Sequence, residues 1–213
     1  MTETTNLNGR LEAFVNSLLQ ETNLSPTAIA RKFSSFHKLS SPPDYRSVID
    51  AGFDFVKHFE LADNMPPELR GFHSIYNGHV QIVLKNHERT GAMLHTILHE
   101  IFEIIITKLN EKKVPPYKLT HYKTNLFAAS VLMPKEVFFE FALKSDLDFL
   151  TIHNHEKYIH LSLQSLLLRL SYLFGLNKIS YFGVIAENKK ANYHQNYPLD
   201  RNAFNNFEMN TIV

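Results

Sequence analysis

Three polar residues inside an apolar stretch have the types and the spacing of a metal site. His99, Glu100 and Glu103 interrupt a run from about Met93 to Leu109 that is otherwise rich in leucine, isoleucine and phenylalanine. Burying such groups costs free energy unless they are paired or hold an ion. In a helix, residues four apart share a face, so His99 and Glu103 point the same way and Glu100 lies beside them. The stretch therefore predicts a helix that carries part of a metal site.

The chemistry that fits this pattern is metal-assisted hydrolysis. A hydrolytic zinc site has three protein ligands, an open position and a base that takes a proton from water. In the His-Glu-x-x-His motif, one helix supplies two ligands at i and i+4, and the intervening glutamate is the base. Here Glu103 replaces the second histidine, and glutamate is itself a zinc ligand. We predict His99 and Glu103 as ligands of Zn2+ and Glu100 as the general base; the residues do not separate zinc from Mn2+ or Fe2+.

The third ligand must come from another element, and His121 is the best candidate. It lies near the start of the next predicted helix, after a Pro115-Pro116 turn that folds that helix back onto the first. His95 is a rival ligand, but it lies eight residues from Glu103, ~12 Å along a helix axis, which is too far to share one ion. We assign His95 to a supporting contact or to the wall of the cleft, together with two residues of the next helix, Tyr122 and Asn125.

The polar aromatic residues near this region receive no role in substrate positioning or in catalysis. His73, Tyr117 and Tyr122 have the chemistry to position a substrate or to stabilise an oxyanion, but nothing in the sequence fixes their orientation. His153, His155 and His160 form a loose cluster that we interpret as part of a solvated loop.

Composition limits the classes of protein that remain. The chain has 213 residues, of which 44% are hydrophobic and 20% charged, which is typical of a soluble globular protein. The formal net charge of +1 gives no broad footprint for nucleic acid or for an anionic membrane. Cysteine is absent, so disulfides and thiolate ligands are excluded. No hydrophobic signal segment or long apolar window occurs, so we expect a cytoplasmic protein without membrane contact.

The hydrophobic periodicity predicts a mostly helical chain with one hairpin. Gly71–Tyr76 and Val80–Leu84 alternate as strands around an Asn77-Gly78 turn. The predicted helices follow apolar spacing, caps and prolines: 11–20, a second from Pro26, 45–58, one opening at 88–90 and closing before 114, 118–131, 136–143 and 161–176. Residues 146–156 read as a loop and 179–185 as a short strand.

These elements predict an α+β fold with four parts. We expect N-terminal helices over 1–40, a core over 41–145 in which a small antiparallel hairpin precedes the site helix, a C-terminal helical segment over 146–186, and a mobile tail over 187–213. The segments 24–36 and 161–176 could form a DNA-binding helix-turn-helix, which makes a DNA-binding regulator a third alternative. It ranks behind a peptidase and a pseudo-protease, because neither segment is distinctly basic.

Two blocks of the sequence resemble a known family. Thr96-x-x-His99-Glu100, preceded by the hairpin, and Asn125-x-Phe127-Ala128-Ala129-x-x-Leu132-Met133-Pro134 resemble the ImmA/IrrE family of metallopeptidases, and the likeness covers roughly 41–175. It implies a fold similar to thermolysin-like zincins, with a helix-turn-helix-like C-terminal extension. It also implies a zinc endopeptidase that cleaves a narrow protein substrate, a helix-turn-helix transcriptional repressor.

The chain departs from that family at the ligands. The family pattern places histidine where this chain has Glu103, and glutamate four residues before Asn125, where this chain has His121. A swap returns the same ligand set, whereas two independent losses would leave unrelated residues. We therefore expect metal binding to be retained. The alternative is an inactive pseudo-protease that binds a regulator without cutting it; Glu100 argues against it, because a binding module has no need of the base.

Overall fold

The computed structural model describes residues 4–66, 68–76, 79–86, 90–113, 115–159, 161–175, 181–187 and 190–195. The chain divides into two compact units, Met1–Pro134 and Lys135–Val213. Helices dominate both, and each contains a small sheet, so the fold class is α+β, as predicted. The four-part division expected from the sequence stays a prediction.

The first unit contains five helices among its described residues. Local sequence explains where several begin: the side chain of Ser25 caps α2, Asp44 caps α3 and Thr120 caps α5, each accepting a main-chain N–H of the first turn. Their bounds are α1 Thr4–Leu19, α2 Pro26–Phe36, α3 Tyr45–Phe53, α4 Thr90–Asn110 and α5 His121–Leu132.

Three strands of the first unit form a mixed sheet in the order β1-β3-β2: β1 His58–Ala62, β2 Gly71–Tyr76 and β3 His79–Lys85. Strands β2 and β3 pair antiparallel, with His73 opposite Ile82, so the predicted hairpin is confirmed. The Asn77-Gly78 turn itself lies outside the described residues. Strand β1, which was not predicted, pairs parallel with β3, so the hairpin belongs to a mixed three-stranded sheet.

Strand β1 also corrects the helix predicted over 45–58. That helix ends at Phe53, and the chain then enters β1 at His58. Phe59 on β1 packs edge-on against Phe53, with ring centroids 4.8 Å apart, and lies against Gly52. Pairing with β3, more than twenty residues further along the chain, overrides the local helical pattern.

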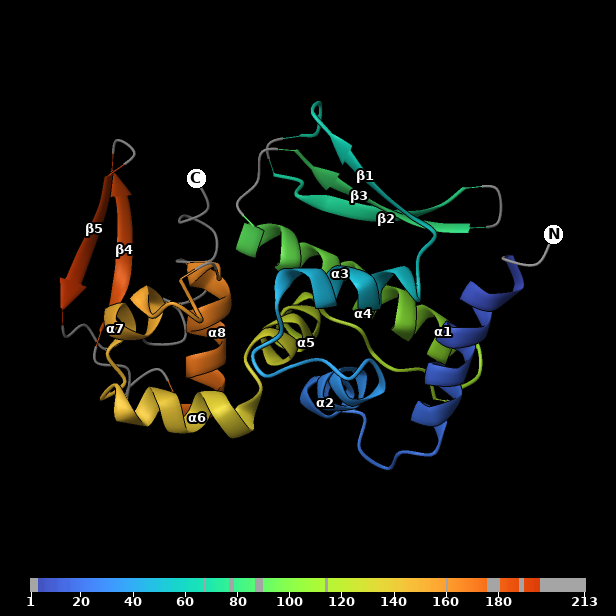
Figure 1. Ribbon diagram of the computed structural model, residues 1–213, viewed down its shortest axis with the longest axis horizontal. Helices are drawn as coiled ribbons and strands as arrows, with labels where there is room; N and C mark the ends of the chain where they lie inside the picture. Colours follow the sequence, from blue (N-terminus) through green and yellow to red (C-terminus); the bar gives the residue numbers. More distant parts are fainter. Residues whose placement is uncertain are drawn as a thin grey trace. The chain divides into compact units, whose positions relative to one another are not determined.

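Helix α4 is the central element of the first unit. It contacts α1, α3 and α5 as well as β2 and β3, and Figure 1 shows the sheet on one side of it with α5 on the other. Thirteen of its residues are buried, including Glu100. The predicted helix is therefore confirmed, and its polar residues lie between the sheet and α5.

A chain of aromatic rings fixes α5 against α4. Phe102 of α4 stacks on Phe127 of α5 with centroids 4.6 Å apart. Phe127 meets Phe33 of α2 at 5.7 Å, and Phe33 meets Phe14 of α1 at 6.1 Å. All four rings are completely buried. Since a buried phenylalanine contributes about 1.5–3 kcal/mol, this row of rings stabilises the packing of α5 against α4.

The second unit contains three helices and a two-stranded sheet among its described residues. Its elements are α6 Lys135–Lys144, α7 Phe149–Asn154, α8 Leu163–Phe174, β4 Tyr181–Glu187 and β5 Lys190–Gln195. Helix α8 ends at Gly175, whose φ of 79° suits glycine, as predicted. The loop predicted over 146–156 is wrong, because Asp148 caps α7. The tail expected from 187 onward includes β5, which pairs with β4; its remainder, 196–213, lies outside the described residues.

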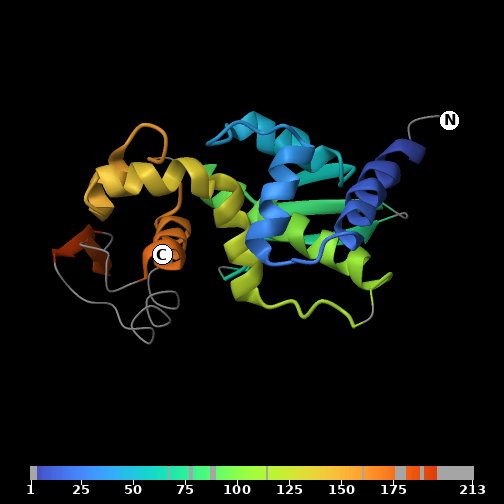
Figure 2. The same cartoon turned by 90° about the horizontal axis from the view of Figure 1, so that it is seen from below.

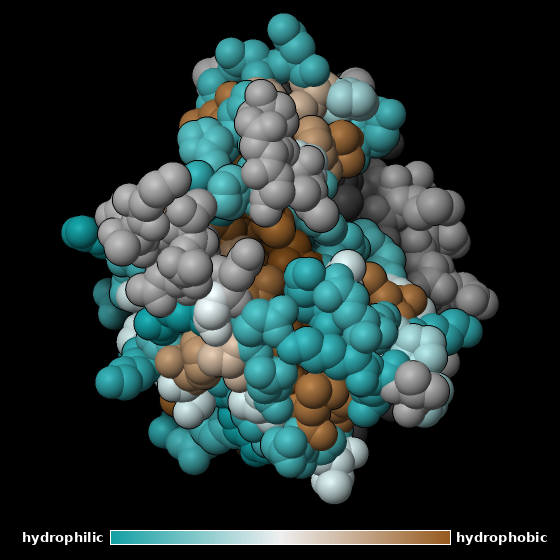
Figure 3. Space-filling model, turned by 90° about the vertical axis from the view of Figure 1, so that its right-hand side faces the viewer, coloured by the Kyte–Doolittle hydropathy of each residue, from teal (hydrophilic) through white to brown (hydrophobic). Residues whose placement is uncertain are grey.

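The distribution of hydrophobic residues along the helices and over one face of the surface is as follows. None of the helices in the described ranges is both long and apolar enough to cross a bilayer. On the face drawn in Figure 3, hydrophobic side chains lie in separate patches between hydrophilic ones. The exposed large hydrophobic residues come from many elements, which agrees with that scatter.

Candidate metal centre

Two rows of side chains on α4 meet at Glu103. His95, His99 and Glu103 follow one another at intervals of four residues, and this row faces α5. Thr96 and Glu100 form a neighbouring row that faces β2 and also leads to Glu103. Because helical geometry brings both rows to the same carboxylate, Glu103 can interact with groups on either side of the helix.

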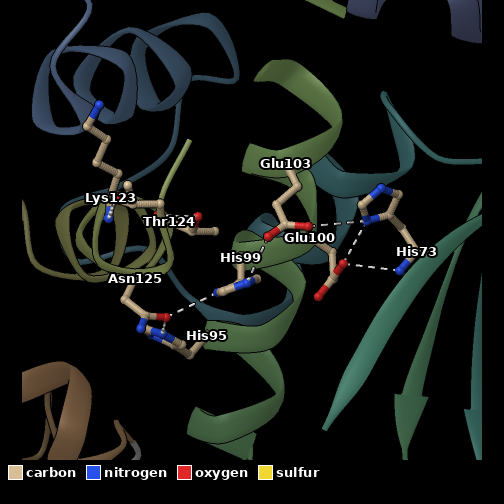
Figure 4. Close-up of polar contacts among 9 residues, drawn as sticks. His73, His95, His99, Glu100, Glu103, Lys123, Thr124 and Asn125 are labelled. Atoms are coloured by element: carbon tan, nitrogen blue, oxygen red, sulfur yellow. Dashed lines mark hydrogen bonds and ion pairs between the residues drawn. The ribbon is translucent and has the colours of Figure 1, made fainter. Parts of the chain in front are cut away.

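On the sheet side, matching spacings place His73 over Glu100. A Cβ added to Gly71 would lie 2.6 Å from Cγ2 of Thr96, so β2 approaches α4 as closely as a glycine allows. Two residues along a strand advance about 6.6 Å, and four residues along a helix advance about 6 Å. His73 and Glu100 therefore meet: the ring Nδ1 lies 2.7 Å, and the main-chain nitrogen 3.1 Å, from Oε2 of Glu100 (Figure 4).

On the α5 side, His99 lies between three polar groups. Its Nε2 is 3.2 Å from Oε1 of Glu103. Its Nδ1 is 3.1 Å from Oδ1 of Asn125, and the same oxygen is 3.0 Å from Nε2 of His95 (Figure 4). The ring of His121, the first residue of α5, has its centroid 5.1 Å from that of His99. The structure therefore brings His99 next to Glu103 and the ring of His121 next to that of His99, with Asn125 between His95 and His99.

The surroundings shift the proton affinities of these groups. Burial lowers the pKa of His99, but the hydrogen bond to Glu103 and the charge of Glu100 outweigh it, so the pKa is raised overall. The hydrogen bond from His99 holds the pKa of Glu103 below its usual range. The hydrogen bond to Glu100 raises the pKa of His73. Burial lowers the pKa of His95 to about 4, so that ring is neutral at pH 7.

The donor set fits zinc. Two ligands bound tetrahedrally at 2.0–2.1 Å lie about 3.3 Å apart, and His99 Nε2 and Glu103 Oε1 are 3.2 Å apart. Asn125 Oδ1 accepts the proton of His99 Nδ1, the usual arrangement behind a metal-binding histidine, so an ion that displaced the proton shared by Nε2 and Glu103 would meet the Nε2 lone pair. His99 and Glu103 would hold the ion, and His121, whose ring lies beside that of His99, is the third ligand that the sequence predicts.

A second combination shares Glu103. Within the described residues, His73, Glu100 and Glu103 each place one ligand atom within 4.8 Å of the others. The separation of 2.7 Å between His73 Nδ1 and Glu100 Oε2, however, is that of a charge-assisted hydrogen bond with a proton between the atoms. In the structure His73 is therefore a hydrogen-bond partner of Glu100, while His99 and Glu103 remain the predicted ligands.

The linker before α5 determines where this helix begins, and so where His121 lies. Asn110, the last residue of α4, binds the main chain of Tyr117 twice: Nδ2 donates to its carbonyl at 3.1 Å, and Oδ1 accepts its N–H at 2.6 Å. Figure 2 shows the segment leading back from the end of α4 to the start of α5. The Thr120 cap then starts α5 at His121, three residues later than predicted.

The remaining predicted residues lie as follows. His95 contacts Asn125, which itself is 4% exposed, so both support His99 from behind. Tyr122 is 53% exposed, and its role stays a prediction. His73, to which the sequence analysis gave no role, is the residue that the structure adds to the site. A signal was present, since His73 alternates with Gly71 and so shares the face of β2 that approaches α4.

Comparisons with known proteins do not identify the chemistry of this site. No protein-family model and no curated protein matches this chain. A solved structure named as a Mycobacterium tuberculosis transcriptional regulator is similar with 11% identity and a TM-score of 0.49, over 78% of this chain and 51% of that one. This chain thus spans about half the length of that regulator.

Proposed function

We propose that this protein is a zinc-dependent endopeptidase. The observation that carries the proposal is the distance of 3.2 Å between His99 Nε2 and Glu103 Oε1, on the helical turn that also presents Glu100. His121 completes a set of two imidazoles and one carboxylate, the composition of thermolysin-like zinc sites. A zinc ion bound there supplies Lewis-acid chemistry, which acidifies water and polarises a carbonyl group.

The protein's own residues supply the proton transfers. Glu100 takes a proton from the attacking water and returns it to the leaving amine, as a general base and then a general acid. Asn125 holds His99 with Nε2 turned toward Glu103. Thr96 and Gly71 lie in close contact between α4 and β2. Glu100, on the same face of α4, is only 7% exposed, which limits the access of water to its carboxylate.

The proposed substrate is a protein with few cleavage sites. The resemblance of the Thr96–Glu100 and Asn125–Pro134 blocks to ImmA/IrrE peptidases supports a helix-turn-helix repressor as the substrate class. The competing proposal is a protein that binds such a regulator without cleaving it. The retained carboxylate of Glu100 and its ordered hydrogen bonds favour the enzyme.

The test combines metal binding with cleavage. Metal-free protein is titrated with zinc against a chromophoric chelator, and the loaded protein is incubated with a proteome-derived peptide library that is then analysed by mass spectrometry. We expect one zinc per chain, with new peptide termini that disappear in Glu100→Gln while zinc binding persists. Glu111→Gln, an exposed carboxylate bonded to Lys108, is the matched control and retains both properties. A wild-type protein that does not bind zinc contradicts the proposal; zinc binding without cleavage favours the non-cleaving regulator.

A further inference from the structure

We propose that His73 is a positioning residue that orients the carboxylate of Glu100 for proton transfer, and that it is not a metal ligand. This inference rests on the proposed peptidase function and extends its machinery to the sheet. The observation behind it is that one residue of β2 directs two donors, its ring and its main-chain N–H, at one oxygen of Glu100.

The two donors fix the orientation of the carboxylate. Nδ1 of His73 and the His73 main-chain nitrogen lie 2.7 Å and 3.1 Å from Oε2. Within the described part of the chain, the hydrogen bonds of Glu100 all use that oxygen, so Oε1 is left for a water molecule or a substrate. Two donors on one oxygen restrict rotation about the last side-chain bond of Glu100, which is otherwise broad.

Burial makes this orientation more important. The side chain of Glu100 is 9% exposed and that of His73 is 27% exposed, so solvent screens the pair only in part. A general base must lie within hydrogen-bonding reach of the proton that it takes. Misplacement of a reacting group by about 1 Å can cost a hundredfold in rate. Holding Glu100 is therefore a catalytic requirement that the helix alone does not meet.

Contacts with Glu103 separate this role from metal binding. His73 Nδ1 is 3.9 Å from Oε2 of Glu103, beyond a hydrogen bond, whereas His99 Nε2 is 3.2 Å from the other oxygen, Oε1. Glu103 thus uses Oε1 toward the proposed ion and presents Oε2 toward the sheet (Figure 4). His73 stands on the Oε2 side, where it neighbours both carboxylates and donates to one.

The first experiment tests the hydrogen bond in the metal-free protein. Nitrogen-15 NMR of the histidine rings should show a protonated Nδ1 on His73 whose proton resonance lies far downfield. In Glu100→Ala that resonance should move or disappear, whereas in Ser74→Ala it should persist, because Ser74 lies on the same strand and bonds Gln81 instead. A His73 ring that does not respond to Glu100→Ala overturns the proposal.

The second experiment tests the role at the loaded site. Acetohydroxamic acid chelates zinc and shares its proton with a neighbouring carboxylate, so its affinity for the zinc-loaded protein reports the position of Glu100. We expect His73→Phe to bind zinc as wild type does but to bind acetohydroxamic acid about tenfold more weakly, the loss of one hydrogen bond to a charged group. His73→Asn, whose amide N–H replaces Nδ1–H, should restore most of that affinity.

A double-mutant cycle decides whether His73 acts through Glu100. In a Glu100→Gln background, His73→Phe should change acetohydroxamic acid affinity little, since the group that it positions is already altered. Additive losses overturn the proposal, and so does a His73→Phe protein that no longer binds zinc, which would make His73 a ligand. Wild-type protein without zinc affinity would remove the peptidase function and the positioning role together, even where the NMR signal persists.

Discussion

The imidazole of His121 lies against that of His99, with ring centroids 5.1 Å apart, although 22 positions separate them in the sequence. This contact joins the start of α5 to the middle of α4. The stacked rings of Phe102 and Phe127 hold the two helices together, and the two hydrogen bonds from Asn110 to the main chain of Tyr117, the Asn110 clamp, hold the linker between them. The site is therefore as rigid as the packing between the two helices, and variants can test each support separately.

Gly71→Ala should destabilise the first unit. The added methyl would lie 2.6 Å from Thr96 Cγ2 and 2.9 Å from the Val83 carbonyl oxygen, so β2 must move away from α4. We expect a loss of about 1–3 kcal/mol in the free energy of unfolding, measured by urea denaturation. Gly9→Ala is the control, because a Cβ there meets nothing within 4 Å; in a helix this change should stabilise by about 0.5–1 kcal/mol. Equal effects of the two substitutions would contradict the close approach.

Asn125→Leu should weaken zinc binding about 10–100-fold, the usual effect of removing a partner behind a metal-binding histidine. The variant takes away the acceptor that fixes the tautomer of His99. Asn125→Asp keeps an acceptor oxygen at that place and should retain an affinity close to that of wild type. Competition titration with a chromophoric chelator measures both. Equal losses in the two variants would mean that Asn125 matters only for packing.

Asn110→Ala should loosen the linker that leads to His121. It removes two hydrogen bonds and leaves the main-chain N–H of Tyr117 without its acceptor, at a cost of about 1–3 kcal/mol in the free energy of unfolding. Hydrogen exchange of the amide of Tyr117 should accelerate more than that of Phe102 in the core. Glu111→Ala, one residue further along and exposed, serves as the control. Unchanged exchange at Tyr117 would show that the clamp is dispensable.

A buried histidine far from the site makes stability depend on pH. The ring of His37 packs against Phe33 and Phe55 and contacts Asp54 Oδ2 at 3.0 Å. Burial lowers the pKa of His37 to about 4, against opposing effects of Asp54. Between about pH 6.5 and pH 4 the unfolded chain therefore binds a proton that the folded protein excludes, so stability falls as pH falls, by at most about 1.4 kcal/mol per pH unit.

His37→Phe should remove this share of the slope. Urea denaturation at pH 7 and pH 4.5 measures it as a difference between variants, because His95, whose burial also lowers its pKa to about 4, contributes a similar slope in both proteins. His58→Phe, an exposed substitution on β1, controls for the added ring. The same slope in wild type and His37→Phe would show that His37 does not exclude the proton.

Local sequence was enough to predict the elements that carry the site. The i, i+4 spacing of His99 and Glu103 predicts their shared face, and the capped, proline-bounded helices and the hairpin appear where periodicity places them. The predictions failed at two strands. Strand β1 forms through parallel pairing with β3, and β5 forms through pairing with β4. The parallel pairing of β1 has no local signature, and the exposed residues of β1 show no regular alternation; β5 pairs with its neighbour in the sequence, but its composition hid it.

Contacts within one helix of the site could be predicted from the sequence, whereas contacts between two elements could not. Glu100, His99 and Glu103 lie on one helix, so their mutual geometry follows from residue spacing. The contact between His73 and Glu100 depends on how β2 lies across α4, and that is set by a glycine that permits close approach. Sequence reasoning reaches such a contact only after the packing of strand on helix is known.

The most direct measurement of the central claim is the position of the ion itself. Crystals of the full chain grown with zinc, with data collected on both sides of the zinc absorption edge, give an anomalous difference map. We predict a single peak about 2.0–2.2 Å from His99 Nε2, a Glu103 oxygen and a His121 nitrogen, with Glu100 outside the ligand sphere. A peak among His73, Glu100 and Glu103, or no peak at α4, would contradict the account.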